Sequence, residues 1–273
     1  MRILVSNDDG IYSPGIALLA DVAAEFGSVR VVAPDGERSS AGHSVTHTRP
    51  LSYRETNIGG VAGYRVDGTP ADCVALGAHL WGEVDLVLSG LNIGLNLGTS
   101  IWHSGTLAAA KQAALLGIRG VALSAPATVA PDFSAYKLWI RRAIEIVIAQ
   151  PNLNLININF PREPRGLVWT RVSVRQYDGR IVPTKDPLGR DLFWFTVRAL
   201  EKAEEGTDRW AVERDWISLT PLKLDLTDEL ALTKVRLEQP LDERSVRQAP
   251  GEAAPQQVRE DEASAPIEMN THR

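Results

Sequence analysis

The sequence has very little cysteine and no long hydrophobic run. Cys73 is the single cysteine in 273 residues, so an internal disulfide is excluded and a reducing compartment such as the cytoplasm is expected. No segment approaches the roughly 20 continuous apolar residues that a membrane span needs. Two acids at positions 8 and 9 come too early for a signal peptide. We therefore expect a cytoplasmic protein with no membrane partner.

Positive charge is also in short supply. The 29 lysines and arginines are outnumbered by 34 acids, which gives a formal net charge of −5. A general nucleic-acid-binding protein normally carries a basic face, so no nucleic-acid partner is expected. Hydrophobic residues make up 44% of the chain, which is ordinary for a globular protein with a substantial core. The acidic balance does not exclude a small anionic substrate.

The end of the chain differs from the rest in composition. Residues 241–273 contain seven acids, four arginines and three prolines, and they have no aromatic residue. Such a segment buries too little surface to offset the entropy lost on ordering. We expect residues 239–273 to form an acidic and mostly disordered tail, in preference to a helix that swaps onto a partner subunit.

Short apolar runs alternate with helical patterns over the first 160 residues. Expected strands cover 3–5, 29–33, 85–88, 121–124 and 153–160. Expected helices follow Ser13-Pro14, Thr69-Pro70 and Ser104, and a fourth covers 134–149. This alternation predicts an α/β fold with a doubly wound, mostly parallel sheet.

The next part of the chain reads as a C-terminal β-rich extension. Strand-like patterns cover 167–174, 192–197 and 216–219, with turns expected at 178–179 and 188–189. The run Phe193-Trp194-Phe195 is either the core of a small β unit or a subunit interface, and we favour the interface. We therefore expect a catalytic core over 1–175 and an oligomerisation arm over 176–238.

Polar residues follow three of the expected strands. In doubly wound sheets, ligands bind beyond the carboxyl ends of the strands, so these residues are the candidate site. They are Asn7, Asp8 and Asp9 after the first strand, Asp35, Glu37, Arg38, Ser39 and Ser40 after the second, and Ser89, Gly90, Asn92, Asn96 and Gly98 after the third.

The adjacent carboxylates Asp8 and Asp9 predict a cation. Two such groups repel each other unless a cation lies beside them. Their neighbours offer hydroxyl and amide oxygens, a donor set that suits Mg²⁺ or Mn²⁺ and not zinc. The alternative is that both acids only cap turns before Gly10. Their position after the first strand of an α/β sheet favours the metal.

The segment Ser104-Gly105-Thr106 predicts an anion site. It opens a helix, whose first amides are unpaired and whose dipole attracts negative charge. No Gly-x-Gly-x-x-Gly fingerprint follows the first strand and no Walker loop occurs, so a nicotinamide oxidoreductase is disfavoured.

Histidine and cysteine give weaker signals. His43 and His47 lie in an extended segment, where a structural or solvated role is favoured over zinc binding. His103 lies beside the anion site and is a candidate phosphate contact or general acid, although ordinary packing explains it about as well. Cys73 is expected to be a buried structural thiol.

Five ordered motifs together resemble the SurE family, the survival protein E group of metal-dependent 5′-nucleotidases. The resemblance covers about residues 1–230, and the motifs are Asn7-Asp8-Asp9-Gly10, Pro34-Asp35 through Arg38-Ser39, Gly68-Thr69-Pro70-Ala71-Asp72-Cys73-Val74, Ser89-Gly90-Leu91-Asn92 with Asn96-Leu97-Gly98, and Ser104-Gly105-Thr106. It implies a Rossmann-like core in a homodimer or homotetramer, built from the β extension and exchanged C-terminal segments.

The resemblance also implies site residues. It implies one divalent cation per subunit, Mg²⁺ or Mn²⁺ with Ca²⁺ as a further candidate. The implied metal ligands are Asp8, Asp9, Ser39 and Asn92, and the implied phosphate-binding residues are Asn96, Ser104, Gly105 and Thr106. His43 stands where some relatives carry a small amide residue, which leaves the surroundings of Ser39 open.

The hypothesis that follows is hydrolysis of nucleoside 5′-monophosphates to nucleoside and phosphate, with 3′-nucleotides or short polyphosphate as further substrates. Its catalytic candidates are Asp8, Asn96 and His103. Asp8 either orients and deprotonates water or attacks phosphorus itself. The rival hypothesis is a nucleotide- or phosphate-sensing module that uses the same loops without turnover.

Overall fold

The computed structural model describes residues 1–127, 133–174, 177–199 and 202–238. The chain divides into two compact units, Met1–Leu224 and Asp225–Arg273. The described part of the second unit holds one helix, α6 (Glu229–Glu238), which has no buried residue and exposes Leu230 and Leu237. The expected tail, residues 239–273, lies outside the described residues.

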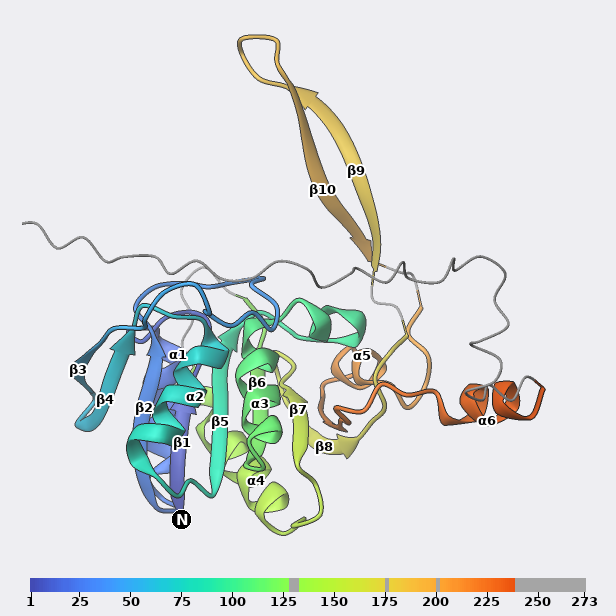
Figure 1. Ribbon diagram of the computed structural model, residues 1–273. Coiled ribbons are helices and arrows are strands. Elements are labelled where there is room, and N and C mark those ends of the chain that lie inside the picture. Colours follow the sequence, from blue (N-terminus) through green and yellow to red (C-terminus); the bar gives the residue numbers. More distant parts are fainter. Residues whose placement is uncertain (128–132, 175–176, 200–201, 239–273) are drawn as a thin grey trace, which may run out of the picture. The chain divides into compact units, whose positions relative to one another are not determined.

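A nine-stranded, mostly parallel sheet runs through the first unit (Figure 1). Its order is β3-β4-β2-β1-β5-β6-β7-β11-β8, and within it β3 and β4 pair antiparallel, as do β7 and β11. The strands are β1 (Arg2–Ser6), β2 (Ser28–Pro34), β3 (Tyr53–Ile58), β4 (Val61–Val66), β5 (Leu86–Ile93), β6 (Arg119–Ala125), β7 (Leu155–Asn159), β8 (Gly166–Trp169) and β11 (Trp216–Pro221).

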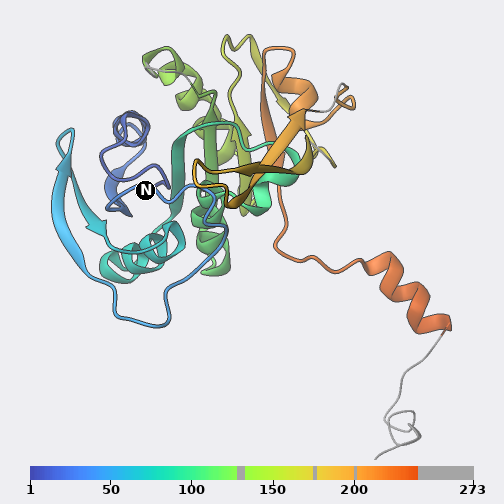
Figure 2. The same ribbon diagram turned by 90° about the horizontal axis from the view of Figure 1, so that it is seen from above.

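Helices cover both faces of this sheet. Figure 2 shows α1 and α4 on one side and α2 and α3 on the other. The helices of the unit are α1 (Pro14–Ala23), α2 (Pro70–Trp81), α3 (Gly105–Leu115), α4 (Lys137–Ile148) and α5 (Asp208–Val212), with short 3₁₀ turns η1 (Gly98–Trp102) and η2 (Ser134–Tyr136). The expected doubly wound α/β fold is confirmed.

The helices begin at the expected capping residues. Thr69 accepts a hydrogen bond from the Asp72 amide while the Asp72 carboxylate accepts one from the Thr69 amide, which forms a capping box. Ser104 accepts a hydrogen bond from the Leu107 amide at the start of α3. The sequence predictions for both helix starts are therefore confirmed.

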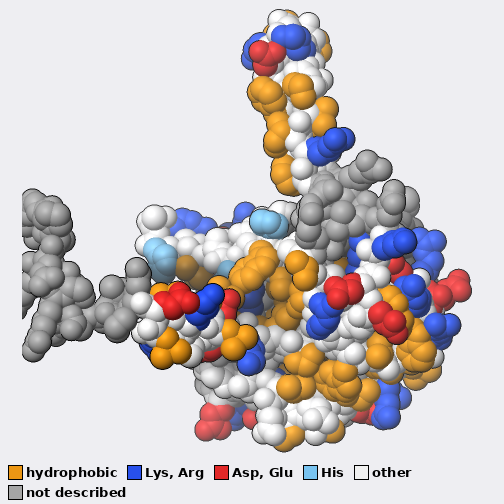
Figure 3. All heavy atoms as spheres, turned by 90° about the vertical axis from the view of Figure 1, so that its right-hand side faces the viewer, with side chains coloured by type: hydrophobic (Ala, Val, Ile, Leu, Met, Phe, Trp, Pro, Cys, Tyr) orange, Lys and Arg blue, Asp and Glu red, His pale blue; other side chains and the backbone are white. Residues whose placement is uncertain are grey.

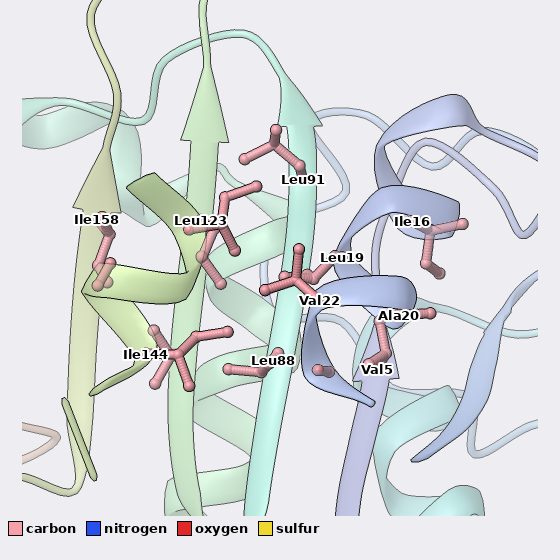
Figure 4. Close-up of a cluster of buried hydrophobic side chains, with 14 of the residues drawn as sticks. Val5, Ile16, Leu19, Ala20, Val22, Leu88, Leu91, Leu123, Ile144 and Ile158 are labelled. Carbon is pink, nitrogen blue, oxygen red and sulfur yellow. The ribbon is translucent and has the colours of Figure 1, made fainter. Parts of the chain in front are cut away.

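The larger core lies between the sheet and the pair α1 and α4 (Figure 4). Apolar side chains of four parallel strands meet one face of each helix there, because alternate strand residues point to the same side. The residues labelled in this region include Val5, Leu88, Leu123 and Ile158 from the strands and Ile16, Leu19, Val22 and Ile144 from the helices.

The strand order reverses at the centre of the sheet. The chain passes from β1 to β2 and β4 on one side and then returns to place β5 on the other side of β1. Crevices form at such reversals, beyond the carboxyl ends of the strands. Asp8 and Asp9 follow β1 and Asn92 lies near the end of β5, so the fold brings three of the four expected metal ligands to the same edge of the sheet.

The C-terminal part differs from expectation in several places. The sheet continues past residue 175, because β11 pairs with β7 and β8. The region expected to be β-rich also contains the helices α5 and α6. The strand expected over 167–174 ends at Trp169, since Arg171 leaves the sheet to pair with Thr207.

The remaining two strands form a separate hairpin, β9 (Tyr177–Lys185) with β10 (Asp191–Ala199). The turn expected at 178–179 is wrong, because both residues lie inside β9. Gly179 faces the Phe195 ring, and a Cβ there would lie 2.8 Å from the ring. The glycine thus leaves space for an aromatic side chain. The turn expected at 188–189 is confirmed, with Gly189 at φ 81°.

Within the described ranges, no helix is long and apolar enough to cross a membrane.

Candidate functional site

Asp8 and Asp9 follow β1 and link it to two neighbouring loops. The Asp8 carbonyl accepts a hydrogen bond from the Arg38 amide at 2.7 Å, which holds the loop after β2 against the end of β1. The Asp9 carboxylate accepts one from the Ile93 amide at 3.1 Å, at the end of β5. The three strand ends predicted to share a site therefore meet.

Both carboxyl groups carry raised pKa values. Burial raises the pKa of Asp8, which is only 4% exposed. Burial and the neighbouring Asp8 charge raise the pKa of Asp9 to about 6. Two adjacent buried carboxylates are costly when both are ionised, and a bound cation would offset that cost.

Ser39 and Asn92 supply neutral oxygens beside this pair. The Ser39 hydroxyl is exposed and donates to Glu37 Oε1 at 2.7 Å. Asn92 is 9% exposed and donates its Nδ2 to the Gly94 carbonyl at 2.6 Å, so its other side-chain atom is the carbonyl oxygen Oδ1. Each residue therefore offers the oxygen that a cation needs.

This donor set fits a hard divalent cation. Among the described residues, no group of three or more His, Cys, Asp or Glu side chains could hold a metal. An ion at Asp8 and Asp9 would thus combine two carboxylates with hydroxyl and amide oxygens. Oxygen-only sets of this kind suit Mg²⁺, Mn²⁺ or Ca²⁺ and disfavour zinc.

The first residues of α3 pack directly against Asp8. Thr106 is fully buried and its hydroxyl donates to Asp8 Oδ1 at 2.7 Å. A Cβ on Gly105 would lie 2.8 Å from Asp8 Oδ2. The absence of a side chain at Gly105 therefore lets the helix start approach the carboxylate. The candidate anion site and the candidate metal site are neighbours.

Asn96 is held from both its main chain and its side chain. Its Nδ2 donates to the Ser124 hydroxyl at 2.9 Å and lies 3.4 Å from the Thr106 hydroxyl oxygen. Its amide donates to Asn159 Oδ1 at 2.8 Å, and its carbonyl accepts from Asn157 at 2.8 Å and Asn159 at 3.1 Å. Asn96 thus lies next to Thr106 in a fixed orientation.

Ser124, Asn157 and Asn159 were not predicted as site residues. All three are fully buried in β6 and β7. Polar residues inside otherwise apolar strands were the available signal, because a buried amide or hydroxyl needs a partner. The strand-end rule, applied to these two strands, finds Ser124 and Asn159 but not Asn157, which lies in the middle of β7.

His103 and His43 form hydrogen bonds with residues other than Asp8 and Asp9. His103 has an exposed side chain and caps η1, with its carbonyl accepting from the Gly42 amide at 3.0 Å. His43 Nε2 lies 2.9 Å from Gln112 Oε1 of α3, a contact that supports its structural role. Cys73 is fully buried, as expected, and burial raises its thiol pKa.

A cleft of about 520 Å³ opens beside the carboxylates. Asp9, Ser39 and the segment 10–14 are among the residues that line it. Tyr12 in that segment is 64% exposed. The lining of the cleft therefore includes both polar oxygens and an aromatic ring.

Fold and site together define a class of protein. It is a doubly wound α/β protein in which the candidate oxygen-only cation site, at the strand-order reversal, adjoins the candidate phosphate site at the start of α3. The model of the family described as survival protein SurE matches residues 3–179. The chain belongs to the SurE family.

Individual relatives agree with this assignment. The 5′-nucleotidase SurE 1 of Thermus thermophilus is 47% identical over 235 residues, covering 83% of this chain and 93% of the relative. The 5′-nucleotidase SurE of Deinococcus radiodurans is 44% identical over 239 residues, covering 83% and 88%. The crystal structure of the SurE protein from Aquifex aeolicus matches with a TM-score of 0.75 and 38% identity, covering 88% of this chain and 100% of that one.

Proposed function

We propose that this protein hydrolyses nucleoside 5′-monophosphates to nucleoside and phosphate with the help of a divalent cation. The observation that carries the proposal is the hydrogen bond from Thr106 to Asp8, which joins the candidate cation site to the candidate phosphate site. Relatives named 5′-nucleotidase, at 44–47% identity over 83% of the chain, support the same reaction.

One divalent cation per subunit would be held by Asp8, Asp9, Ser39 and Asn92. When bound, such an ion offsets negative charge on a phosphoryl group and stabilises its transition state. The raised pKa values of Asp8 and Asp9 support this assignment, because they mark a site where positive charge is missing. Mg²⁺ and Mn²⁺ are the preferred candidates, and Ca²⁺ is the third.

The phosphate group would lie at the start of α3. The main-chain amides of Gly105 and Thr106 open the helix, where unpaired N–H groups and the helix dipole favour an anion. The hydroxyl and the main chain of Thr106 both hydrogen-bond to Asp8, so the Gly105 amide is the first group proposed to meet phosphate. Ser104 and Asn96 supply side-chain contacts from either side, which would stabilise charge on the transferred group.

Asp8 is the proposed catalytic carboxylate. The Thr106 hydroxyl fixes Oδ1, which leaves Oδ2 to orient a water molecule and take its proton. Direct attack of Oδ2 on phosphorus, through an aspartyl-phosphate, is the alternative chemistry. Exposed His103 is the candidate proton donor to the leaving nucleoside oxygen.

The nucleoside would occupy the cleft beside Asp9. An exposed ring such as Tyr12 can stack on a base of any identity. A cleft of this open kind is compatible with 3′-nucleotides or short polyphosphate as further substrates.

We also propose that the protein works in the cytoplasm as a homodimer or homotetramer. Hydrophobic side chains gather along the β9–β10 hairpin (Figure 3), and Phe193, Trp194 and Phe195 are each at least 64% exposed. Exposed aromatic patches of this kind are commonly covered by a partner. The single, buried cysteine supports a reducing compartment.

Phosphate release from a panel of 5′- and 3′-nucleotides tests the reaction, with Mg²⁺, Mn²⁺, Ca²⁺ or EDTA. We expect release from 5′-monophosphates that requires a metal and stops in EDTA. Nucleotide binding without release, under every metal, would favour the sensing module instead. That rival has little support, since two carboxylates at a pure phosphate-binding site would only repel the ligand.

A further inference from the structure

The carboxylate of Asp208 contacts the loop that carries Asn96, although the two lie far apart in the sequence. Asp208 is the first residue of α5 and is fully buried. Its Oδ2 accepts a hydrogen bond from the Gly98 amide at 2.9 Å, across 110 residues of chain. We propose that Asp208 is a positioning residue that holds the Asn96–Gly98 loop for catalysis, an inference that rests on the proposed function.

Three further donors fix the orientation of this carboxylate. Its Oδ1 accepts from the Ser173 amide at 3.0 Å, the Ser173 hydroxyl at 2.5 Å and the Arg209 amide at 2.7 Å. Charge-assisted hydrogen bonds are shorter and stronger than neutral ones, and a buried carboxylate needs several. Oδ2 is therefore held toward Gly98.

Capping of α5 does not explain Asp208. Thr207 is the N-cap of that helix, and its hydroxyl accepts from the Trp210 amide at 3.3 Å. The Asp208 side chain contacts Gly98 and Ser173, which lie outside α5. A residue needed only for the helix would not require either contact.

Gly98 is a sensitive point of the loop. It has φ 55°, a conformation suited to glycine, and it starts η1 two residues after Asn96. Asn157 and Asn159 hold the loop at Asn96, and Asp208 holds it at Gly98. The chain then continues through η1 to Ser104, so a shift at Gly98 would move Asn96 and Ser104, two of the four residues proposed to bind phosphate.

The same carboxylate joins this loop to the base of the hairpin. Ser173 precedes β9 in the chain and Asp208 follows β10, and both bond to each other through Oδ1. The Asp208 amide also donates to the Arg171 carbonyl at 2.9 Å. One carboxylate oxygen of Asp208 therefore accepts from Ser173 at the base of the hairpin, and the other accepts from Gly98 in the Asn96–Gly98 loop. The two contacts can thus be tested separately.

Asp208→Asn tests the contact with Gly98, because an amide has one acceptor oxygen and its NH₂ group would face a donor. We expect kcat for AMP hydrolysis to fall about 10- to 100-fold, since misplacement of a reacting group is costly. The Kd for Mn²⁺, measured by calorimetry without substrate, should stay within about threefold, because no proposed metal ligand lies on this loop. Assays run well below the melting temperature separate this loss from destabilisation.

Ser173→Ala is the matched control. It removes the hydroxyl contact with Oδ1 and leaves the Gly98 contact in place. We expect kcat within about twofold of the unaltered protein, in line with a loss of one hydrogen bond away from the loop. Equal losses in both variants, or full kcat in a folded Asp208→Asn protein, would overturn the proposal.

Hydrogen exchange of the Gly98 amide, followed by NMR in the unaltered protein, covers the case in which Asp208→Asn does not fold. Protection of this amide supports the proposal, and exchange at the rate of an unstructured peptide overturns it. This measurement needs no turnover. An unaltered protein with a protected Gly98 amide and no nucleotidase activity would contradict the proposed function and leave the contact established.

Discussion

Asp8 is the residue on which the contacts of the site converge. Its main chain holds the loop after β2 through Arg38, and its side chain accepts from Thr106 of α3. Only 4% of it is exposed, so the carboxylate has lost most of its hydration. Burial of this carboxylate lowers the stability of the fold, whereas its proposed catalytic role raises activity, so substitution should affect stability and activity differently.

Asp8→Asn should lower kcat about 10²- to 10⁴-fold, because an amide can neither take a proton from water nor attack phosphorus. The fold should survive. Burial raises the pKa of the Asp8 carboxyl because ionising it there is costly, and the neutral amide avoids that cost. Turnover with Mn²⁺ and thermal unfolding in EDTA are the measurements. Asp21→Asn, at an exposed carboxylate paired with Lys137, is the control and should leave kcat unchanged. Near-normal turnover in Asp8→Asn would contradict the catalytic assignment.

Asp9 should make stability without a cation depend on pH. Its folded-state pKa is raised to about 6, so its contribution is fully present below the ordinary value of 3.8 and is lost as the pH rises through about 6. Asp9→Asn should therefore become more stable relative to the unaltered protein between pH 4 and 7 in EDTA. Urea unfolding at several pH values measures this difference.

A cation should reverse that trend. Mn²⁺ competes with protons for the two carboxylates, so its stabilisation of the unaltered protein should grow as the pH rises through about 6. A parallel pH dependence in the unaltered protein and in Asp9→Asn would mean that Asp9 is not the group responsible.

At the scale of elements, the start of α3 shows how a helix and a strand end make one site. Ser104 caps the helix, Gly105 gives close approach and Thr106 bonds to Asp8. Each residue has a different geometric role. We therefore expect substitutions in the first turn of α3 to lower activity more than substitutions in its later, alanine-rich turns.

Gly105→Ala should lower kcat by tenfold or more. The added Cβ would lie 2.7 Å from the Asp8 Cβ and 2.8 Å from its Oδ2, distances at which the carboxylate must move. Calorimetry should show weaker Mn²⁺ binding as well. Ala114→Gly, a change of the same single carbon later in α3, should cost about 1 kcal/mol of stability and leave kcat intact. An unchanged Mn²⁺ affinity in Gly105→Ala would contradict this prediction, because it would show that the Asp8 side chain can shift without loss of metal binding.

At the scale of the whole molecule, the exposed hairpin is the proposed subunit interface. Three consecutive aromatic residues, Phe193, Trp194 and Phe195, remain in solvent in a single copy of the chain. Among the described residues, their strand β10 pairs only with β9. Exposing these apolar side chains to water has an unfavourable free energy, and burying them in an interface would remove it.

Trp194→Glu should lower the molecular mass of the assembly, measured by light scattering after gel filtration. A charge placed in an apolar interface loses hydration and finds no partner, so a dissociation constant raised at least tenfold is expected. Leu138→Glu, at a 70% exposed position of α4, is the control and should not change the mass. A mass unchanged by Trp194→Glu but lowered by Leu138→Glu would place the interface on α4 instead.

Much of the architecture could be predicted because it depends on local patterns. The capping signals at Thr69 and Ser104 and the apolar runs of β1 and β6 each report on a few neighbouring residues, and all are confirmed. The turn expected at residues 178–179 was wrong for the opposite reason. Gly179 lies inside β9 and packs against the ring of Phe195 across the hairpin, a contact that no local sequence pattern predicts.

The sequence by itself determined most of the strand–helix alternation over the first 160 residues, with β3 and β4 the exceptions, and also the family motifs and the kinds of donor atoms in the site. These follow from periodicity and residue chemistry. Only the tertiary structure decided how those donors are held. Asn157 reaches Asn96 across 61 residues and Asp208 reaches Gly98 across 110, contacts that depend on strand order. Burial, which raises the pKa values of Asp8 and Asp9, likewise exists only once the sheet and α3 have packed together.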